Sequence, residues 1–346
     1  MGKIVEKYKV NASVAHNSHL YFIVGSENIF VDYSIDDNKI IRIQKLPKEC
    51  CNTYYGLLLA DDKYIFFIPR SGLFKLIKYD IDSRDYQILG NTSKKWNGHN
   101  YIFTAQLVDK KIYAFPGYGN AVIVVDTEKM SFEEVSFKSK SKQAHFCGHV
   151  SELNNCLIFS VMHPDEFDNK IAKFDINANA LYFDMSDDHE IGYANGIVHE
   201  KNFVGMDRCG NIEIYNLTEG KYQNIFSDYC IEDKGYRFLM VDEEYYYAFS
   251  ILTNVVYVYD KYKMEKSICK IETAEQSFVL YYDGYFFVFG ENVVKKYKYL
   301  QGELKKISEF EFGEEVYISK TIAMEGASIE SKDLNLKNYI LILRKN

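Results

Sequence analysis

The sequence predicts an all-β domain of the β-propeller class, and three observations lead to that expectation. Apolar segments recur along the whole chain, with first residues 40 to 54 positions apart. A pair formed by an apolar residue and a turn former recurs in phase with them. The chain is also rich in aromatic residues, 16%, with 30 Tyr and 24 Phe, which suit half-buried pleated strands.

The apolar segments predict the second strand of each repeated unit. A period in the low to mid forties is the length of one propeller blade of four strands. The eight segments are Leu20–Val24, Tyr64–Ile68, Ile112–Phe115, Cys156–Phe159, Phe203–Met206, Tyr245–Phe249, Tyr285–Phe289 and Tyr339–Leu343.

The recurring pairs predict where each third strand ends. Ser, Asp and Asn side chains accept hydrogen bonds from the backbone two residues on, and so start a tight turn into a fourth strand. The pairs are Tyr33-Ser34, Tyr79-Asp80, Val125-Asp126, Phe174-Asp175, Tyr215-Asn216 and Tyr259-Asp260, with Tyr297-Lys298 as a degraded seventh copy.

A first strand is expected before each apolar segment. Tyr54–Ala60 precedes a turn at Asp61–Lys63, and Phe278–Tyr282 precedes Asp283-Gly284. Asp-Gly between apolar strands is a strong hairpin signal. The unit is therefore four antiparallel strands, and such sheets must stack to bury both faces and close into a ring to protect their edges.

The number of blades has two solutions. The pattern contains eight first and second strands but only seven hairpins between third and fourth strands. The main expectation is eight blades, the last one composite, with Ile4–Val10 adding to the strands that end near Leu343. The alternative is seven blades followed by a C-terminal extension. Glu325–Lys332 is the only stretch that suggests a helix, as an insertion in the last unit.

Composition and charge limit the class of partner. The chain has only 4 Pro and no stretch typical of a linker, so one domain over residues 1–346 is expected. The net charge of −8 without a dense basic run argues against nucleic acid. The N-terminus does not have the pattern of a signal peptide, and the sequence has no apolar run long enough to span a membrane. Without an export signal, the 7 Cys are expected to be reduced thiols. We expect a cytoplasmic monomer.

The repeat resembles the kelch-like and related bacterial β-propellers across essentially the whole chain. The resemblance is one of architecture. The Trp-Asp signature of WD40 blades is missing, because Asn97 follows the only Trp, Trp96, and the paired glycines of kelch blades are also missing. The resemblance therefore implies a fold and transfers no functional residues.

Propellers generally bind ligands on the face formed by the connections between blades and the turns between second and third strands. The rarer polar and aromatic residues of those loops are the candidate site. They are Arg70, Trp96, His99, Tyr118, His145, His163, His189, Arg208, Tyr236 and Arg237.

Three functions compete for these residues. The first is binding of a peptide or an anionic small molecule, with the three arginines as anion contacts and Trp96, Tyr118 and Tyr236 as aromatic walls. The second is a metal-assisted lyase or hydrolase with the four loop histidines as ligands, helped by Asp165 or Glu190. The third is a non-catalytic scaffold for a protein partner. No cofactor is implied, and the sequence favours a protein that is not an enzyme.

One strand pattern has the residue types of a metal site. His145, Cys147 and His149 alternate and so share one side of a strand. Three such residues span roughly 13 Å, which is too far for all of them to bind one ion. A buried cysteine with hydrogen-bonded histidines is the favoured interpretation, and no metal site is assigned.

Overall fold

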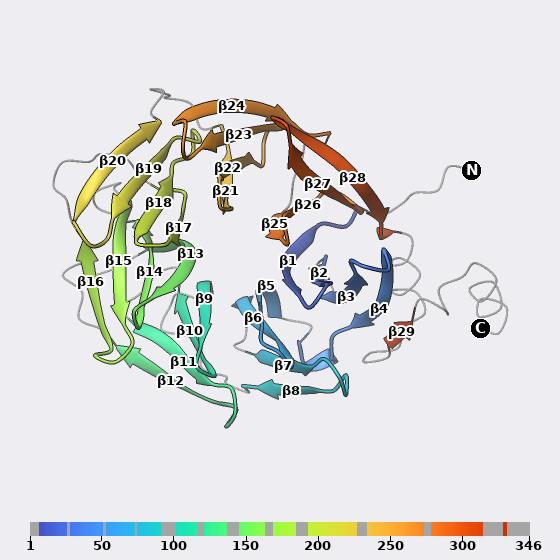
Figure 1. Cartoon of the computed structure of the whole chain (residues 1–346). Coiled ribbons are helices and arrows are strands. Elements are labelled where there is room, and N and C mark those ends of the chain that lie inside the picture. The colour runs from blue at the N-terminus through green and yellow to red at the C-terminus, as the bar shows by residue number, and fades with distance from the viewer. Residues whose placement is uncertain are drawn as a thin grey trace. The chain divides into compact units, whose positions relative to one another are not determined.

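The computed structural model of the chain is built almost entirely from β-strands (Figure 1). The described part also contains the short 3₁₀ helix η1 (Lys48–Cys50). The structure describes residues 7–25, 28–50, 53–72, 75–90, 102–116, 121–136, 145–162, 169–184, 193–226, 234–272, 278–313 and 328–330.

The strands of the described residues form seven antiparallel sheets, each containing four strands that are consecutive in the chain. We call these sheets blades 1 to 7 in chain order. The architecture is that of a β-propeller, as the repeat predicted. The chain divides into two compact units, unit 1 (residues 1–92 and 275–346) and unit 2 (residues 93–274), and each is described by itself.

Unit 1 contains three blades. Blade 1 consists of β1 (Val10–His16), β2 (His19–Val24), β3 (Ile29–Ser34) and β4 (Lys39–Lys45), with β29 (Ser328–Glu330) added to β4. Blade 2 consists of β5 (Thr53–Ala60), β6 (Tyr64–Gly72), β7 (Leu76–Asp80) and β8 (Tyr86–Leu89). Blade 7 consists of β25 (Phe278–Tyr282), β26 (Tyr285–Phe289), β27 (Val293–Leu300) and β28 (Glu303–Glu311).

Unit 2 contains four blades. Blade 3 consists of β9 (Ile102–Val108), β10 (Lys111–Pro116), β11 (Ala121–Asp126) and β12 (Ser131–Ser136). Blade 4 consists of β13 (His145–Leu153), β14 (Cys156–Met162), β15 (Asn169–Asp175) and β16 (Ala180–Asp184). Blade 5 consists of β17 (Asn195–His199), β18 (Asn202–Met206), β19 (Ile212–Asn216) and β20 (Lys221–Phe226). Blade 6 consists of β21 (Tyr236–Val241), β22 (Tyr245–Ser250), β23 (Val255–Asp260) and β24 (Glu265–Lys270).

The prediction of eight blades is wrong, and the seven-blade alternative is confirmed. The first blade is already complete because Val10–His16 pairs with β2 as its first strand. The preceding residue Tyr8 does not add a strand to a last blade. Its N–H donates to Asn292 Oδ1 at 2.8 Å, and its carbonyl accepts from Asn292 N in the turn between β26 and β27. The expected eighth second strand, Tyr339–Leu343, lies outside the described residues.

Six of the seven recurring pairs do end third strands, as predicted. The first member of every pair is at most 4% exposed. In five blades the acidic or amide oxygen that follows it accepts N–H groups two and three residues on, which fixes the turn into the fourth strand. The five are Asp80, Asp126, Asp175, Asn216 and Asp260.

The degraded seventh pair lies differently from the prediction. Tyr297 is buried, but β27 continues past Lys298 to Leu300 because a lysine cannot accept the backbone hydrogen bonds of the turn. The chain reverses instead at Gln301-Gly302, both with positive φ. The Asp283-Gly284 hairpin forms as expected, with φ of 50° and 76°.

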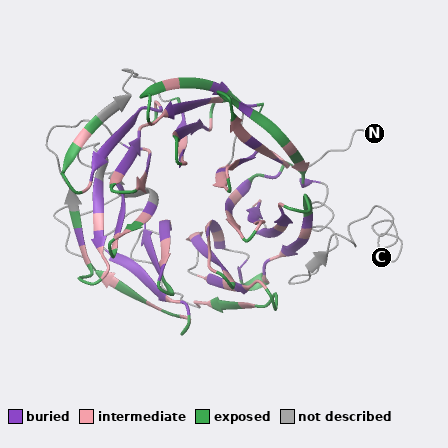
Figure 2. Ribbon diagram, in the orientation of Figure 1, coloured by how far each residue is buried: buried purple, intermediate pink, exposed green. Residues whose placement is uncertain are grey.

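The apolar core of each unit lies between consecutive blades. Among the described residues, each of five clusters of buried side chains combines two neighbouring sheets: blades 7 and 1, blades 1 and 2, blades 3 and 4, blades 4 and 5, and blades 5 and 6. Figure 2 shows the second and third strands mostly buried and the fourth strands largely exposed. Burial of both sheet faces is therefore achieved by stacking, as the repeat required.

One fourth strand departs from this pattern. The fourth strand of blade 1, β4, is buried at Ile40, Arg42, Ile43 and Gln44. β29 pairs antiparallel with it, with Ser328 opposite Gln44. The helix suggested for Glu325–Lys332 is therefore wrong for its described residues, because the edge of β4 offers backbone partners to an extended segment.

Candidate functional site

Half of the residues predicted for the loop site lie outside the described part of the chain. These are Trp96, His99, Tyr118, His163 and His189. The backbone of His145 forms the first residue of β13. No group of three or more metal-ligating side chains occurs among the residues that the structure describes. The metal alternative therefore stays a hypothesis about the undescribed loops.

Three of the predicted residues, Arg208, Tyr236 and Arg237, come together in unit 2. Tyr236 N donates to the carbonyl oxygen of Arg208 at 3.2 Å, and Arg237 Nη1 donates to the carbonyl of Tyr236. Asn195 of blade 5 holds this segment by donating to the carbonyl of Arg237 at 2.8 Å. The Arg208 side chain is exposed. Together these contacts fix the backbone around two of the predicted anion contacts.

The side chain of Tyr236 is packed into the core. It is 1% exposed and stacks on Tyr257 with ring centroids 4.7 Å apart. Burial raises the pKa of its phenol, so the hydroxyl stays protonated at neutral pH. The ring thus joins blades 5 and 6, and its role as a ligand wall stays a prediction.

The last predicted residue, Arg70, belongs to unit 1. Its side chain lies over Gly56 of β5, where a Cβ would stand 2.4 Å from Arg70 Cδ. Glycine is needed at this position because any larger residue would displace the arginine. Arg70 lies in a different unit from Arg208 and Arg237, so the three-arginine anion site also stays a prediction.

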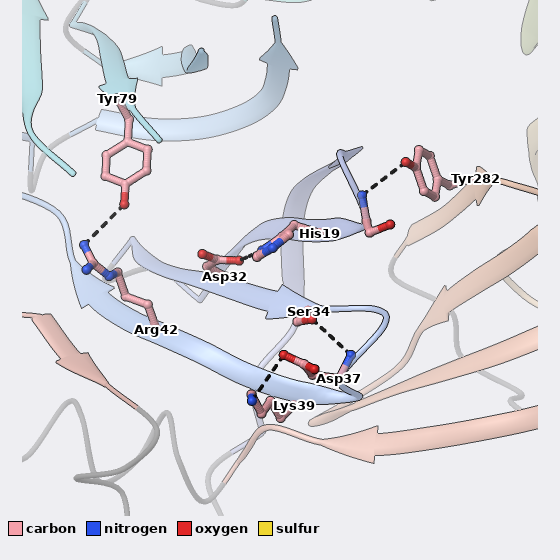
Figure 3. A network of polar contacts seen from close by, with 9 residues as sticks. His19, Asp32, Ser34, Asp37, Lys39, Arg42, Tyr79 and Tyr282 are labelled. Atoms are coloured by element: carbon pink, nitrogen blue, oxygen red, sulfur yellow. Dashed lines mark hydrogen bonds and ion pairs between the residues drawn. The ribbon is translucent and has the colours of Figure 1, made fainter. Parts of the chain in front are cut away.

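A row of polar side chains crosses blade 1 (Figure 3). His19 Nδ1 lies 2.5 Å from Asp32 Oδ1 across β2 and β3, and the hydrogen bond to Asp32 raises the pKa of His19. A carboxylate that orients a histidine is one part of a catalytic base. No hydroxyl or thiol hydrogen-bonds to His19 among the described residues, so the pair has no nucleophile to activate there. It works as a link between two strands.

The same row continues toward blade 2. Arg42 of β4 is 4% exposed, and its Nη1 donates to the hydroxyl of Tyr79 at 3.3 Å (Figure 3). Two residues further along β4, Gln44 Nε2 donates to the hydroxyl of Tyr86 at 2.5 Å. Both donors come from blade 1 and both hydroxyls from blade 2. Two polar bridges therefore span the junction of these blades.

A groove opens beside the second bridge. We call it the β4–β8 groove, and its volume is about 590 Å³. Two basic and two acidic residues balance the charge of its walls, and Ile88 adds an apolar edge. It is lined by Gln44, Pro47, Lys48, Glu49, Arg84, Asp85, Tyr86 and Ile88.

The lining of this groove contains an unused hydrogen-bonding atom. Gln44 is 4% exposed, and its Oε1 is buried with no hydrogen-bond partner among the described residues. A buried polar atom without a partner costs about 1–3 kcal/mol. Natural proteins keep such an atom rarely, so its place beside the groove calls for an explanation.

Comparisons with known proteins show the fold. No protein family matches the sequence. No curated protein matches it either. A solved structure of the computationally designed protein Ika8 is similar with a TM-score of 0.58 and 9% identity, covering 89% of this chain and 88% of that one.

A second similar structure is that of BamB from Moraxella catarrhalis. Its TM-score is 0.54 at 11% identity, and the alignment covers 81% of this chain and 82% of that one. The architecture is a β-propeller. At these identities the similarity extends to the fold alone, and the kelch-like character stays a prediction.

The sequence contains no signal for the β4–β8 groove. Gln44 and Tyr86 are ordinary strand residues, 42 positions apart and in different blades. Their approach depends on how two sheets stack.

Proposed function

We propose that this chain is a non-catalytic β-propeller scaffold that binds a polypeptide partner in the β4–β8 groove. The observation that carries the proposal is the buried Gln44 Oε1, which lines the groove and has no hydrogen-bond partner among the described residues. A binding partner that donates to this oxygen recovers the free energy lost by its burial.

A strand edge beside the groove supports a polypeptide as the partner. β8 is the last strand of blade 2, and no further strand of the described chain pairs with it. Its outer N–H and C=O groups can pair with an extended segment, which is the means of binding called β-augmentation. Blade 1 contains an example, because β29 adds to β4 as a short antiparallel strand.

The surface of the groove also suits a protein partner better than a metal or a nucleic acid. Lys48 and Arg84 are balanced by Glu49 and Asp85, so the groove offers no excess of positive charge for phosphates. Ile88 is 36% exposed and provides apolar area for contact.

Affinity capture from the source cells tests the proposal through one substitution. Ile88→Asp introduces a charge into the groove and should lower recovery of the partner at least about tenfold relative to the wild-type protein. Ile268→Asp is the matched control, because Ile268 is an isoleucine on a fourth strand, β24, and is 63% exposed. Equal recovery with Ile88→Asp and wild type, or recovery of no partner with any of the proteins, contradicts the proposal.

A further inference from the structure

We infer that the Gln44–Tyr86 pair recognises a carboxamide side chain, Asn or Gln, carried by an extended segment of the partner that adds as a strand to β8. The inference rests on the proposed function and specifies which chemistry the groove accepts. Three features support the inference: the hydrogen-bonding capacity of Gln44 and Tyr86, the charge of the groove, and the direction of the β8 side chains.

The Gln44–Tyr86 pair leaves at least one donor and one acceptor unused. With Gln44 Nε2 donating to the Tyr86 hydroxyl, Gln44 Oε1 is an acceptor without a partner, and the Tyr86 proton is a donor. With the amide turned over, Tyr86 donates to Oε1, and Nε2 and the phenol oxygen take the two roles. Either orientation presents a donor beside an acceptor.

The donor is retained at neutral pH. Burial raises the pKa of the Tyr86 hydroxyl, so it keeps its proton. A ligand group that satisfies both positions must therefore accept one hydrogen bond and donate another from adjacent atoms. A primary carboxamide does this, whereas a carboxylate only accepts and an ammonium group only donates.

The charge of the groove favours the same neutral group. Lys48 and Arg84 balance Glu49 and Asp85, so the groove has no net charge that would compensate a carboxylate or an ammonium group for its lost hydration. A neutral amide loses less hydration free energy on burial. The groove thus favours Gln over Glu by the cost of desolvation and over Met by hydrogen bonding.

The geometry of β8 shows how such a side chain reaches the pair. Tyr86 and Ile88 line the groove, so alternate residues of β8 face it. A strand added at the edge of β8 presents every second side chain to the same face of the sheet. Backbone pairing with β8 then supplies affinity, and the side chain in the groove supplies specificity.

A set of labelled peptides tests this chemistry directly. The probes are extended peptides of alternating Thr and Val whose central residue is Gln, Asn, Glu, Lys or Met, and binding to the full chain is followed by fluorescence anisotropy. We expect the Gln or Asn peptide to bind at least about tenfold more tightly than the Met, Glu and Lys peptides, because a site built for hydrogen bonds rejects ligands that leave them unmade.

Three variants locate the preference. Gln44→Met and Tyr86→Phe should each reduce the preference for Gln over Met to about threefold or less, since each removes one of the two groups that read the amide. Gln87→Met is the matched control, because Gln87 is the adjacent residue of β8, is exposed and does not line the groove. It should keep the wild-type preference.

The outcomes separate this inference from the proposed function. Equal binding of all peptides by the wild-type protein, a preference that survives in Gln44→Met and Tyr86→Phe, or binding of no peptide overturns the carboxamide inference. The proposed function fails on a different result, namely partner capture that Ile88→Asp leaves unchanged. Capture of a partner that depends on Ile88, together with equal binding of all peptides, would support the proposed scaffold function and overturn the carboxamide inference.

Discussion

Two junctions between neighbouring blades solve the same packing problem differently. The junction of blades 1 and 2 in unit 1 and that of blades 5 and 6 in unit 2 both have an aromatic core. Tyr21, Phe30, Phe67 and Tyr79 contribute to the first. Tyr236, Tyr246, Tyr257 and Tyr259 contribute to the second. The difference lies in the polar groups around each core.

The polar groups between blades 5 and 6 bind one another. Lys261 Nζ lies 2.9 Å from His199 Nε2, also donates to the carbonyl of Asp242, and lies 4.8 Å from the centre of the Tyr246 ring. The Tyr259 hydroxyl donates to the carbonyl of Gly210. This junction is closed by contacts within the chain, which makes it a structural joint.

The polar groups between blades 1 and 2 are only partly used. Asn28 Nδ2 donates to the carbonyl of Thr53, and Arg42 and Gln44 each donate to a tyrosine hydroxyl. Gln44 Oε1 and Asn28 Oδ1 nevertheless have no partner among the described residues. The comparison teaches that equivalent interfaces of one repeat can serve structure in one place and leave hydrogen bonds for another molecule in another.

The largest expected effects come from the two aromatic cores. Phe30→Ala and Tyr236→Ala should each lower the free energy of unfolding by about 3–5 kcal/mol, because both side chains are 1% exposed and leave a cavity. Urea denaturation measures both. A much smaller loss for Phe30→Ala would mean that the two junctions differ in their cores as well as in their polar groups.

The next effect separates structural from unused polar groups within the junction of blades 1 and 2. Tyr79→Phe should cost about 1–3 kcal/mol, because it removes the hydroxyl that accepts from the buried Arg42. Gln44→Met should change stability by no more than about 0.5 kcal/mol, because relief of the buried oxygen offsets the lost bond to Tyr86. Denaturation midpoints distinguish the two. A loss for Gln44→Met as large as for Tyr79→Phe would assign Gln44 to structure instead of binding.

The junction of blades 5 and 6 should weaken in mild acid. Burial, followed by the charge of Lys261, lowers the pKa of His199 below its ordinary value of 6.5. The unfolded chain therefore binds a proton before the folded one does, and stability falls as the pH drops below about 6.5. Measured urea midpoints between about pH 5 and pH 8 should show this fall in the wild-type protein. His199→Gln should flatten it, and an unchanged slope would exclude His199 as its source.

Blade 1 should show the smallest effect, with the opposite sign. The hydrogen bond to Asp32 raises the pKa of His19 above 6.5. Its contribution to stability is fully present below about pH 6.5 and is lost as the pH rises through the raised value. His19→Gln should remove this loss while leaving the acid-side fall due to His199. Identical pH profiles for the two variants would contradict the assignment of opposite shifts.

Much of the fold could be predicted because local chemistry repeats in every blade. The turn after each third strand depends on a side chain and the two or three residues beyond it, as at Asp80 and Asp260, so the sequence shows it directly. The blade number could not be settled this way. Ile4–Val10 was expected to close a last blade, whereas the structure pairs Val10–His16 with β2 as the first strand of blade 1.

The candidate site shows more clearly what the sequence alone cannot predict. The predicted residues were chosen as rare polar or aromatic residues in loops, and Tyr236 shows why that choice is incomplete. It was predicted to lie in a connection between blades, whereas it is the first residue of β21 and packs on Tyr257 of β23, two strands away in the same sheet. Gln44 and Tyr86 escaped notice because neither residue is rare and neither lies in a motif.

The sequence by itself determined the four-stranded repeat, the turns that end the third strands and the propeller class, because these follow from alternation, period and short-range hydrogen bonding. Only the tertiary structure decided that seven blades form, that β29 adds to β4, and that Gln44 and Tyr86 meet beside a groove. The physical reason is that strand pairing and sheet stacking join residues distant in the chain. Whether the buried Gln44 amide has a hydrogen-bond partner between blades 1 and 2 depends on the residues of the facing sheet. No local sequence pattern encodes which residues those are.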